Sequence, residues 1–206
     1  MLEQLSGLII HLIQATGYFG IFILMTLESA LIPIPSEVTM PFSGFLISKG
    51  TLSLIPVILA GAVGNLIGSL IAYAIGYYLE ENVILSLVGK YGKFILMTKS
   101  DYLKSVAWFK KYGNSVVFFS RLLPAVRTFI SLPAGLAEMN IWKFSIYTFV
   151  GSLIWSALLT MVGVYMGDNW HALESYFRKF DFLILGIAIF AFAFYINHKL
   201  KILKFR

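Results

Sequence analysis

The sequence predicts an all-α integral membrane protein built as an inverted repeat. Each unit is expected to hold an amphipathic helix, a re-entrant helical hairpin and a transmembrane helix, with one more transmembrane helix at the C-terminal end. Three observations support this prediction. The 206-residue chain is 59% hydrophobic and 13% charged, with a mean hydropathy of +0.84. Two long stretches hold no charged residue, and two other apolar stretches are interrupted by prolines and charges.

Composition restricts the class of protein. Globular chains are about 45–50% apolar and about 25% charged, so this chain lacks the polar surface that a water-soluble domain needs. The net charge of +6 is expected to face anionic phospholipid head groups and the cytoplasm rather than nucleic acid. The chain has no cysteine, and its three histidines are too far apart in sequence for metal-ligand spacing, so we expect no metal and no cofactor.

The basic residues are concentrated in two segments. Six lysines lie within 80–111 against three acidic residues, and four basic residues without an acid end the chain at 199–206. By the positive-inside rule both segments are cytoplasmic. We therefore expect a multi-pass protein with a cytoplasmic C-terminus.

Three apolar stretches are predicted to cross the membrane. Residues 54–79 and 144–167 contain no charge over 26 and 24 positions, and each exceeds the roughly 20 residues that a crossing helix needs. The shorter run 182–198 is the expected C-terminal span. Small residues recur four apart along 54–79, a pattern that allows close helix packing: Ala60, Gly64, Gly68, Ala72 and Gly76. Three tyrosines near its cytoplasmic end are assigned to the interfacial aromatic belt: Tyr73, Tyr77 and Tyr78.

The apolar regions 15–48 and 112–139 are not expected to cross. Both contain interior prolines and two charges near the centre, and each charge at mid-membrane costs roughly 2.5–3.5 kcal/mol. Irregular backbone at that depth is stable only inside protein or beside a wet cavity. We expect two re-entrant hairpins that turn at their prolines. The residues assigned to hairpin turns and close packing are Pro33, Pro35, Gly44, Gly64, Gly68, Gly76, Pro124, Pro133 and Gly135.

The two hairpins belong to an internal repeat with an offset of 91 positions. Without a gap it aligns Ser29/Ser120, Leu31/Leu122, Pro33/Pro124, Gly44/Gly135 and Gly76/Gly167. Because each unit crosses the membrane once, the second unit is inverted relative to the first, an architecture that transporters use to place substrate sites near the midplane.

The repeat divides a single membrane domain, 1–206, into four parts. These are repeat 1 (1–80), a cytoplasmic basic connector (81–99), repeat 2 (100–170), and the C-terminal span with its basic tail (171–206). Residues 2–14 and 100–111 are expected to form the amphipathic helices that open the repeats. An alternative is that residues 5–27 form a further crossing helix.

Four charged residues are the candidate site. Glu28 and Glu37 come from the first hairpin, and Arg121 and Arg127 come from the second. If the hairpin tips meet, acids face bases; an intramembrane ionisable residue is a functional-site hypothesis by default. Arginine binds phosphate oxygens in a bidentate manner, and burial favours the protonated form of a carboxyl, which would allow coupling to protons. The alternative is a static salt bridge that holds the hairpins together.

Enzyme motifs are missing from the sequence, which therefore predicts a protein that is not an enzyme. It contains no HExxH, no GxSxG and no Gly-rich phosphate loop. Ser120 and Arg121 begin the SRxxxxxH pattern of lipid phosphatases, but Arg127 stands where that pattern has its histidine nucleophile.

Two motifs resemble those of bacterial DedA family membrane proteins, of the VTT (SNARE-associated Golgi domain) superfamily. They are Glu28-Ser-Ala-Leu-Ile-Pro33-Ile-Pro35-Ser-Glu37 with Pro41-Phe-Ser-Gly44, and Phe119-Ser-Arg121-Leu-Leu-Pro124-Ala-Val-Arg127 with Pro133-Ala-Gly135 and Met139. The resemblance covers roughly residues 15–170. One departure concerns the second acid, because some relatives carry an aspartate several residues beyond the position of Glu37.

The resemblance implies a flippase of the bacterial cytoplasmic membrane that recycles the lipid carrier undecaprenyl phosphate. It implies that Arg121 and Arg127 bind the phosphate and that Glu28 and Glu37 gate the path or carry protons. The alternatives are a phosphatidylethanolamine flippase or scramblase with the same geometry, a secondary transporter for small ions or cations, and a membrane organiser without transport activity.

Overall fold

The structure is a computed structural model that describes residues 2–32, 34–79 and 99–170. All regular structure in these residues is helical. The elements are α1 (Leu2–Thr16), α2 (Tyr18–Ser29), α3 (Ser36–Ser48), α4 (Leu54–Tyr78), α6 (Lys99–Ser120), α7 (Pro124–Phe129), α8 (Ser131–Leu136), α9 (Ile141–Met166) and the 3₁₀ turn η1 (Gly167–Trp170). The predicted span 182–198 and the connector, except for its last residue, lie outside the described residues.

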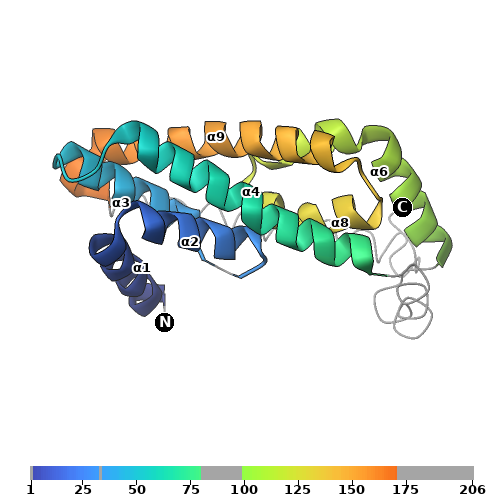
Figure 1. The fold of residues 1–206 in the computed structure, drawn as a ribbon, viewed down its shortest axis with the longest axis horizontal. Coiled ribbons are helices and arrows are strands. Elements are labelled where there is room, and N and C mark those ends of the chain that lie inside the picture. Colours follow the sequence, from blue (N-terminus) through green and yellow to red (C-terminus); the bar gives the residue numbers. More distant parts are fainter. Residues whose placement is uncertain (1, 33, 80–98, 171–206) are drawn as a thin grey trace, which may run out of the picture.

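Two of the described helices are long and apolar enough to cross a membrane. They are Leu54–Tyr78, with a mean hydropathy of 2.1, and Ile141–Asn169, with a mean hydropathy of 1.8. The first is α4, and the second is α9 together with most of η1. Helices α4 and α9 pack against each other along the long axis of the molecule (Figure 1). The prediction of long apolar helices at 54–79 and 144–167 is confirmed.

The first predicted hairpin corresponds to α2 and α3, which run antiparallel. Near the start of α2, the Tyr18 hydroxyl accepts a hydrogen bond from the backbone N–H of Ser53, which follows α3 (2.9 Å). The chain reverses between these helices over residues 30–35. Residues 5–27 are not one continuous helix, because Gly17 adopts a positive φ of 59° that separates α1 from α2.

The second hairpin is built from α6, α7 and α8. The helix expected at 100–111 is not a separate element, because α6 continues without interruption to Ser120 and supplies the first arm of the hairpin. The chain then turns, and α7 begins at Pro124, whose fixed φ suits the first turn of a helix. The returning helix α8 packs on α6, with Ala134 and Ala137 in one hydrophobic cluster with Phe109 and Val117.

The returning arm of each hairpin packs on the long helix from the other half of the chain: α3 on α9, and α8 on α4. Gly44 in α3 lies so close to α9 that a Cβ there would meet the carbonyl oxygen of Thr160. Gly135 in α8 lies against α4, where a Cβ would meet the carbonyl oxygen of Tyr73. Gly44 and Gly135 align at the 91-residue offset, so the same contact is made twice with the two halves exchanged.

Glycines of the long helices make the corresponding contacts with the hairpin arms, except that the equivalent positions in α4 and α9 differ by one helical turn from the 91-residue alignment. A Cβ on Gly163 of α9 would meet the carbonyl oxygen of Pro41, and a Cβ on Gly76 of α4 would meet that of Leu132. Pro41 and Leu132 are again 91 positions apart. The packing counterpart of Gly76 is therefore Gly163, one helical turn before the Gly167 that the ungapped alignment paired with it.

Two further glycines bring α4 close to α2. A Cβ on Gly64 would meet the carbonyl oxygen of Phe22, and a Cβ on Gly68 would meet that of Thr26. This close approach is the geometry that small residues four apart allow. Of the prolines assigned to the turns, Pro33 lies outside the described residues, Pro35 immediately precedes α3, and Pro133 lies within α8.

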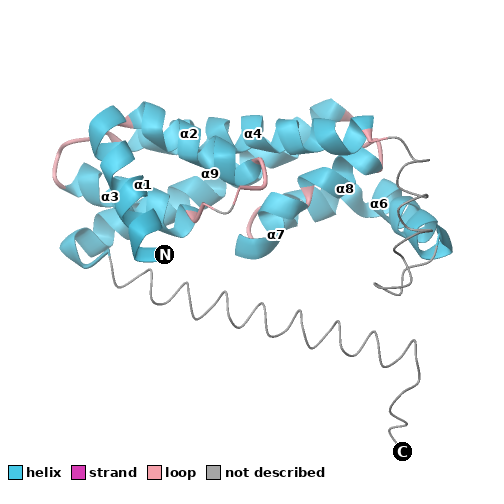
Figure 2. Cartoon of the chain, turned by 90° about the horizontal axis from the view of Figure 1, so that it is seen from below, coloured by secondary structure: helices cyan, strands magenta, loops and turns pink. Residues whose placement is uncertain are grey.

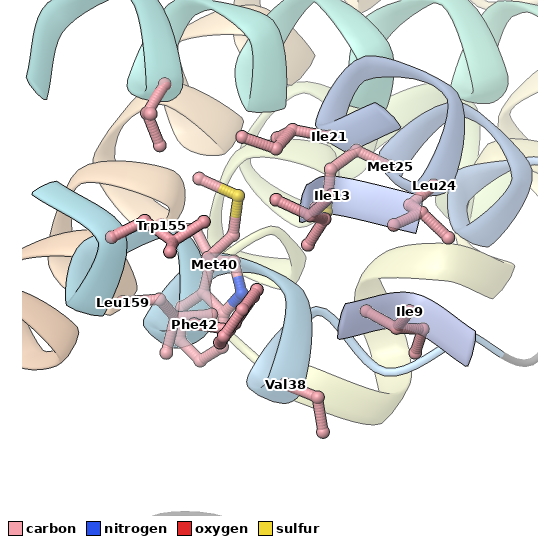
Figure 3. Packing of buried hydrophobic residues seen from close by; sticks show 12 residues of the cluster. Ile9, Ile13, Ile21, Leu24, Met25, Val38, Met40, Phe42, Trp155 and Leu159 are labelled. Carbon is pink, nitrogen blue, oxygen red and sulfur yellow. The ribbon is translucent and has the colours of Figure 1, made fainter. Parts of the chain in front are cut away.

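A hydrophobic core fills the space between α1, α2, α3, α4 and α9 (Figure 3). Its members with the least exposure are Ile9, Ile13, Ile21, Met25, Met40, Val57 and Leu159. Trp155 of α9 belongs to the same cluster and lies on its border with the polar centre of the molecule. The core therefore holds the first hairpin against α9 and fixes one wall of the candidate site.

Candidate functional site

A buried ion pair joins the two hairpins. Glu28 lies in the last turn of α2 and Arg127 lies in α7, and their exposed fractions are 5% and 3%. An Nη2–H of Arg127 donates to Oε1 of Glu28 and also to the hydroxyl of Ser36. The same Oε1 accepts the backbone N–H of Ser36 at 3.2 Å. Figure 2 shows the turn between α2 and α3 beside α7.

Arg121 is the second buried guanidinium, with 2% exposure. Its Nη1 donates to the hydroxyl of Ser69 on α4 at 2.8 Å and to the backbone carbonyl of Arg127 at 2.9 Å. Its Nη2 donates to the hydroxyl of Ser131 on α8 at 3.0 Å. All three acceptors are uncharged. Within the described ranges no carboxylate lies within ion-pair distance of Arg121.

Helix α9 supplies an aromatic surface for both guanidiniums. The central carbon of the Arg121 guanidinium lies 5.6 Å from the ring centre of Phe144, and that of Arg127 lies 5.5 Å from the ring centre of Trp155. Guanidinium groups at such distances from an aromatic face are stabilised by cation–π attraction. Gly151, between these rings on α9, leaves room for the Cβ and Cγ of Arg121. Arg121 is thereby held in place by neutral groups, whereas Arg127 has the Trp155 ring in addition to its ion pair with Glu28.

Three polar atoms of the buried charged residues in this cluster have no hydrogen-bond partner among the described residues. They are Oε2 of Glu28, Nε of Arg121 and Nε of Arg127. Buried polar atoms are nearly always paired with protein or with ordered water. The cluster therefore has one acceptor and two donors available for a further polar group.

The charges in the cluster do not cancel. Two buried guanidiniums face one buried carboxylate, and Glu37, in the first turn of α3, is half-buried and forms no ion pair within the part of the chain that the structure describes. An uncompensated buried charge is strongly unfavourable. A small anion bound beside Arg121 would compensate it.

The structure brings together three of the four residues predicted for the site. Glu28 and Arg127 contact directly, and Arg121 joins them through the carbonyl of Arg127. Glu37 stands apart from these hydrogen bonds.

The cluster lies where the two halves of the chain meet. Ser36 and Arg127, which contact each other, are also partners at the 91-residue offset. If the two halves are related by the two-fold axis that an inverted repeat predicts, equivalent positions touch only beside that axis. Sequence reasoning missed Ser36, although the offset applied to Arg127 points to it.

Several other side chains around the arginines were also missed. They are Ser69, Ser131, Phe144 and Trp155. Serines and aromatic residues are common throughout this sequence, and nothing in their spacing marks these four. In the described part of the chain, no group of three or more His, Asp or Glu residues is placed to hold a metal ion.

Comparison with known proteins gives a consistent family. The sequence-family model of the VTT domain matches residues 34–165 of this chain. An "alkaline phosphatase-like protein" of Lactococcus lactis subsp. cremoris is 36% identical over 184 residues, covering 89% of this chain and 86% of that protein. "Undecaprenyl phosphate transporter A" of Bacillus subtilis is 35% identical over 190 residues, covering 91% and 92% of the two chains. The Staphylococcus aureus protein of the same name is 31% identical over 192 residues, covering 92% and 95%.

No solved structure matches this chain. The domain match covers the first hairpin motif from Ile34 onward, the whole of the second motif and nearly all of both long helices. The relatives match over nearly the whole chain. The chain therefore belongs to the VTT-domain, or DedA, family of membrane proteins.

Proposed function

We propose that this protein is a lipid flippase that returns undecaprenyl phosphate from the outer to the inner leaflet of the bacterial cytoplasmic membrane. The observation that carries the proposal is Arg121, a buried guanidinium with neutral partners beside the Glu28–Arg127 pair. Two relatives that match this chain over most of its length are named undecaprenyl phosphate transporters.

In this proposal the lipid phosphate binds between the two arginines. Guanidinium groups remain charged when desolvated and match phosphate oxygens with paired N–H donors. Arg121 supplies positive charge that no described carboxylate neutralises, and Nε of each arginine has no partner. The polyprenyl tail stays among the lipid chains while the head group passes between the hairpins.

Glu28 controls whether Arg127 is available to the phosphate. The carboxylate and the phosphate compete for the same guanidinium, because Glu28 Oε1 already accepts from Arg127 Nη2. Protonation of Glu28 would weaken this pair and release Arg127, which couples phosphate binding to proton uptake. Glu37, half-buried nine positions further on, is the proposed route by which protons reach Glu28.

The proposal includes a membrane placement. The two hairpins are re-entrant, the repeats are inverted, α4 and α9 cross the bilayer, and the C-terminus is cytoplasmic. The exchanged contacts support this placement. The packing of Gly44 of α3 against α9 and the packing of Gly135 of α8 against α4 are the same interaction, made once by each half of the chain. An inverted repeat of this kind puts the charged cluster near the bilayer midplane.

The proposal is tested with the purified chain in liposomes. Labelled polyprenyl phosphate, the matching polyprenol and labelled phosphatidylethanolamine are each placed in one leaflet, and their appearance in the other is followed. We expect transfer of the polyprenyl phosphate at a rate that the Arg121→Lys variant reduces. Transfer of phosphatidylethanolamine without the polyprenyl phosphate would replace this proposal with the aminophospholipid alternative, and transfer of neither lipid would refute it.

Proton coupling is tested separately with the same liposomes. An imposed pH gradient should accelerate the movement of polyprenyl phosphate, and an ionophore that collapses the gradient should remove the acceleration. Equal rates with and without the gradient would eliminate coupling while leaving phosphate transport intact.

A further inference from the structure

A cavity of about 490 Å³ lies at the C-terminal end of α4, beside the turn that joins α8 to α9. Helix α4 contributes Tyr73, Tyr77 and Tyr78 to its wall, and the turn contributes Glu138. Figure 1 shows the end of α4 lying beside α8 at the opposite end of the molecule from α1. None of the lining residues belongs to the hydrogen-bonded cluster around Arg121 and Arg127. The cavity is therefore a second site, distinct from the charged centre.

Its aromatic wall is built from a fixed ring and two outer rings. Tyr73 is 4% exposed; its hydroxyl donates to the carbonyl oxygen of Met139, and its ring centre lies 4.8 Å from that of Phe144. Tyr77 stacks on Tyr73 with ring centres 6.0 Å apart and an interplanar angle of 18°. Tyr78 lies at 89° to Tyr77, with ring centres 5.4 Å apart. The cavity therefore has a rigid floor and two perpendicular aromatic rings at its rim.

Glu138 places an exposed carboxyl group at this aromatic wall. Its backbone adopts a positive φ of 53°, a conformation that residues other than glycine rarely take. The turn is held by a hydrogen bond from the Glu138 N–H to the carbonyl oxygen of Gly135 at 2.8 Å. Glu138 forms no ion pair with any residue in the described ranges. The cavity thus combines tyrosine rings with an unneutralised carboxylate.

We propose that this cavity binds the ammonium group of a phospholipid head group. Aromatic faces attract organic cations, and cages of aromatic residues recognise ammonium ligands. The carboxylate of Glu138 adds a charge of opposite sign. A volume of about 490 Å³ lies within the range of ligand sites, roughly 300–1,000 Å³. The carboxylate of Glu138 disfavours a lipid whose head group carries only negative charge.

The ligand is a lipid rather than a soluble amine because of where the cavity lies. It is at the end of a helix long and apolar enough to cross a membrane, and its wall includes the apolar side chains of Leu70, Ala74 and Ile141. Ile141 and Tyr78 are also exposed on the outer surface, at 49% and 80%. A bound head group can therefore keep its acyl chains in the adjoining bilayer.

Calorimetric titration of the purified full chain in detergent tests the site. The probes are dihexanoyl phosphatidylethanolamine, dihexanoyl phosphatidylglycerol and free ethanolamine. We expect phosphatidylethanolamine to bind about tenfold more tightly than either of the others, and Glu138→Gln and Tyr77→Leu each to weaken its binding about tenfold, a factor within the range of cation–π and charge-assisted contacts.

The matched control is Tyr165→Leu. Tyr165 is 82% exposed on α9 and lines no part of this cavity, so this variant should bind phosphatidylethanolamine like the parent chain. Circular dichroism and the unfolding temperature show whether each variant is folded. Equal binding of phosphatidylethanolamine and phosphatidylglycerol, or unchanged binding in a folded Glu138→Gln variant, would overturn the proposal. Free ethanolamine binding as tightly as the lipid would overturn the assignment to a lipid.

The inference does not depend on the proposed transport of undecaprenyl phosphate. The Arg121→Lys variant separates the two, because it changes the charged centre and leaves every residue of the cavity unchanged. Phosphatidylethanolamine binding retained in this variant supports a separate ammonium site, whatever the variant does to transport. Loss of that binding in a folded Arg121→Lys variant would show that the two sites are one and would overturn the inference.

Discussion

Replacing Glu28 with glutamine removes the acid that pairs with Arg127 while preserving the size of the side chain. Both guanidiniums of the cluster then remain buried, at 2% and 3% exposure, and no carboxylate among the described residues contacts either of them. The amide oxygen can still accept the backbone N–H of Ser36, so the turn between α2 and α3 keeps this hydrogen bond. The change therefore isolates the charge of Glu28 from its packing.

The expected loss of stability is large. Removing one partner of a buried ion pair costs about 3–5 kcal/mol, because the remaining charge is left without compensation. For a domain of 150–250 residues, 1 kcal/mol corresponds to a shift of roughly 2–4 °C in the unfolding temperature. The Glu28→Gln variant is therefore expected to unfold about 6–20 °C below the parent chain.

The assay is thermal unfolding of the purified protein in detergent, with and without a short-chain polyprenyl phosphate. The anion should stabilise Glu28→Gln more than the parent chain, because it supplies the negative charge that the substitution removed and ligand binding raises apparent stability. Glu37→Gln, the same change at a half-buried acid without an ion pair in the described ranges, is the matched control and should shift the transition by less than about 2 °C. Equal small shifts in both variants would refute the view that Glu28 compensates a buried charge.

Three further predictions test other parts of the structure. Arg121→Lys cannot reproduce all of the guanidinium's hydrogen bonds, each of which contributes about 1.5–3 kcal/mol. Lipid transfer in liposomes should therefore fall about 10- to 100-fold. An unchanged rate would exclude Arg121 from the path. Gly44→Ala forces a Cβ against a backbone carbonyl of α9 and should destabilise the protein by about 1–3 kcal/mol in thermal unfolding. The control is Gly7→Ala, whose added Cβ meets nothing within 4 Å and should leave the stability unchanged. Similar behaviour of the two variants would contradict the close packing of α3 on α9. Lys49→Ala removes the exposed ion pair with Asp168 and should change stability by less than about 1 kcal/mol in the same assay, and a larger loss would mean that η1 is held mainly by this pair.

The positions of the main helices follow directly from the distribution of charges and prolines. A charge-free stretch such as 54–79 has no interruption, and the structure has α4 at Leu54–Tyr78. Helix α3 begins directly after Pro35, because the fixed φ of proline suits the start of a helix. Pro41 lies inside α3 and does not end it, so a proline alone does not predict where a helix stops. The uninterrupted stretch and the helix start are local effects, so a single sequence is enough to predict them.

The arrangement inside the site depends on contacts that are distant in sequence. The repeat led us to expect acids facing bases, and the structure pairs Glu28 with Arg127, 99 positions apart. It does not bring Glu37 into that pair, because the N-terminal turn of α3 leaves this side chain half-buried. Ser69 and Trp155 reach the arginines from α4 and α9, and periodicity alone does not reveal which face of a uniformly apolar helix is turned inward.

Equilibrium binding of a short polyprenyl phosphate and of its parent alcohol to the purified chain would test the central claim most directly, since the two ligands differ only in the phosphate. The account predicts that the phosphate binds at least tenfold more tightly than the alcohol, and that Arg121→Lys removes most of this difference while leaving the binding of the alcohol unchanged. Equal affinities of the two ligands for the parent chain would contradict it, because the buried guanidiniums would then have no part in recognising the lipid.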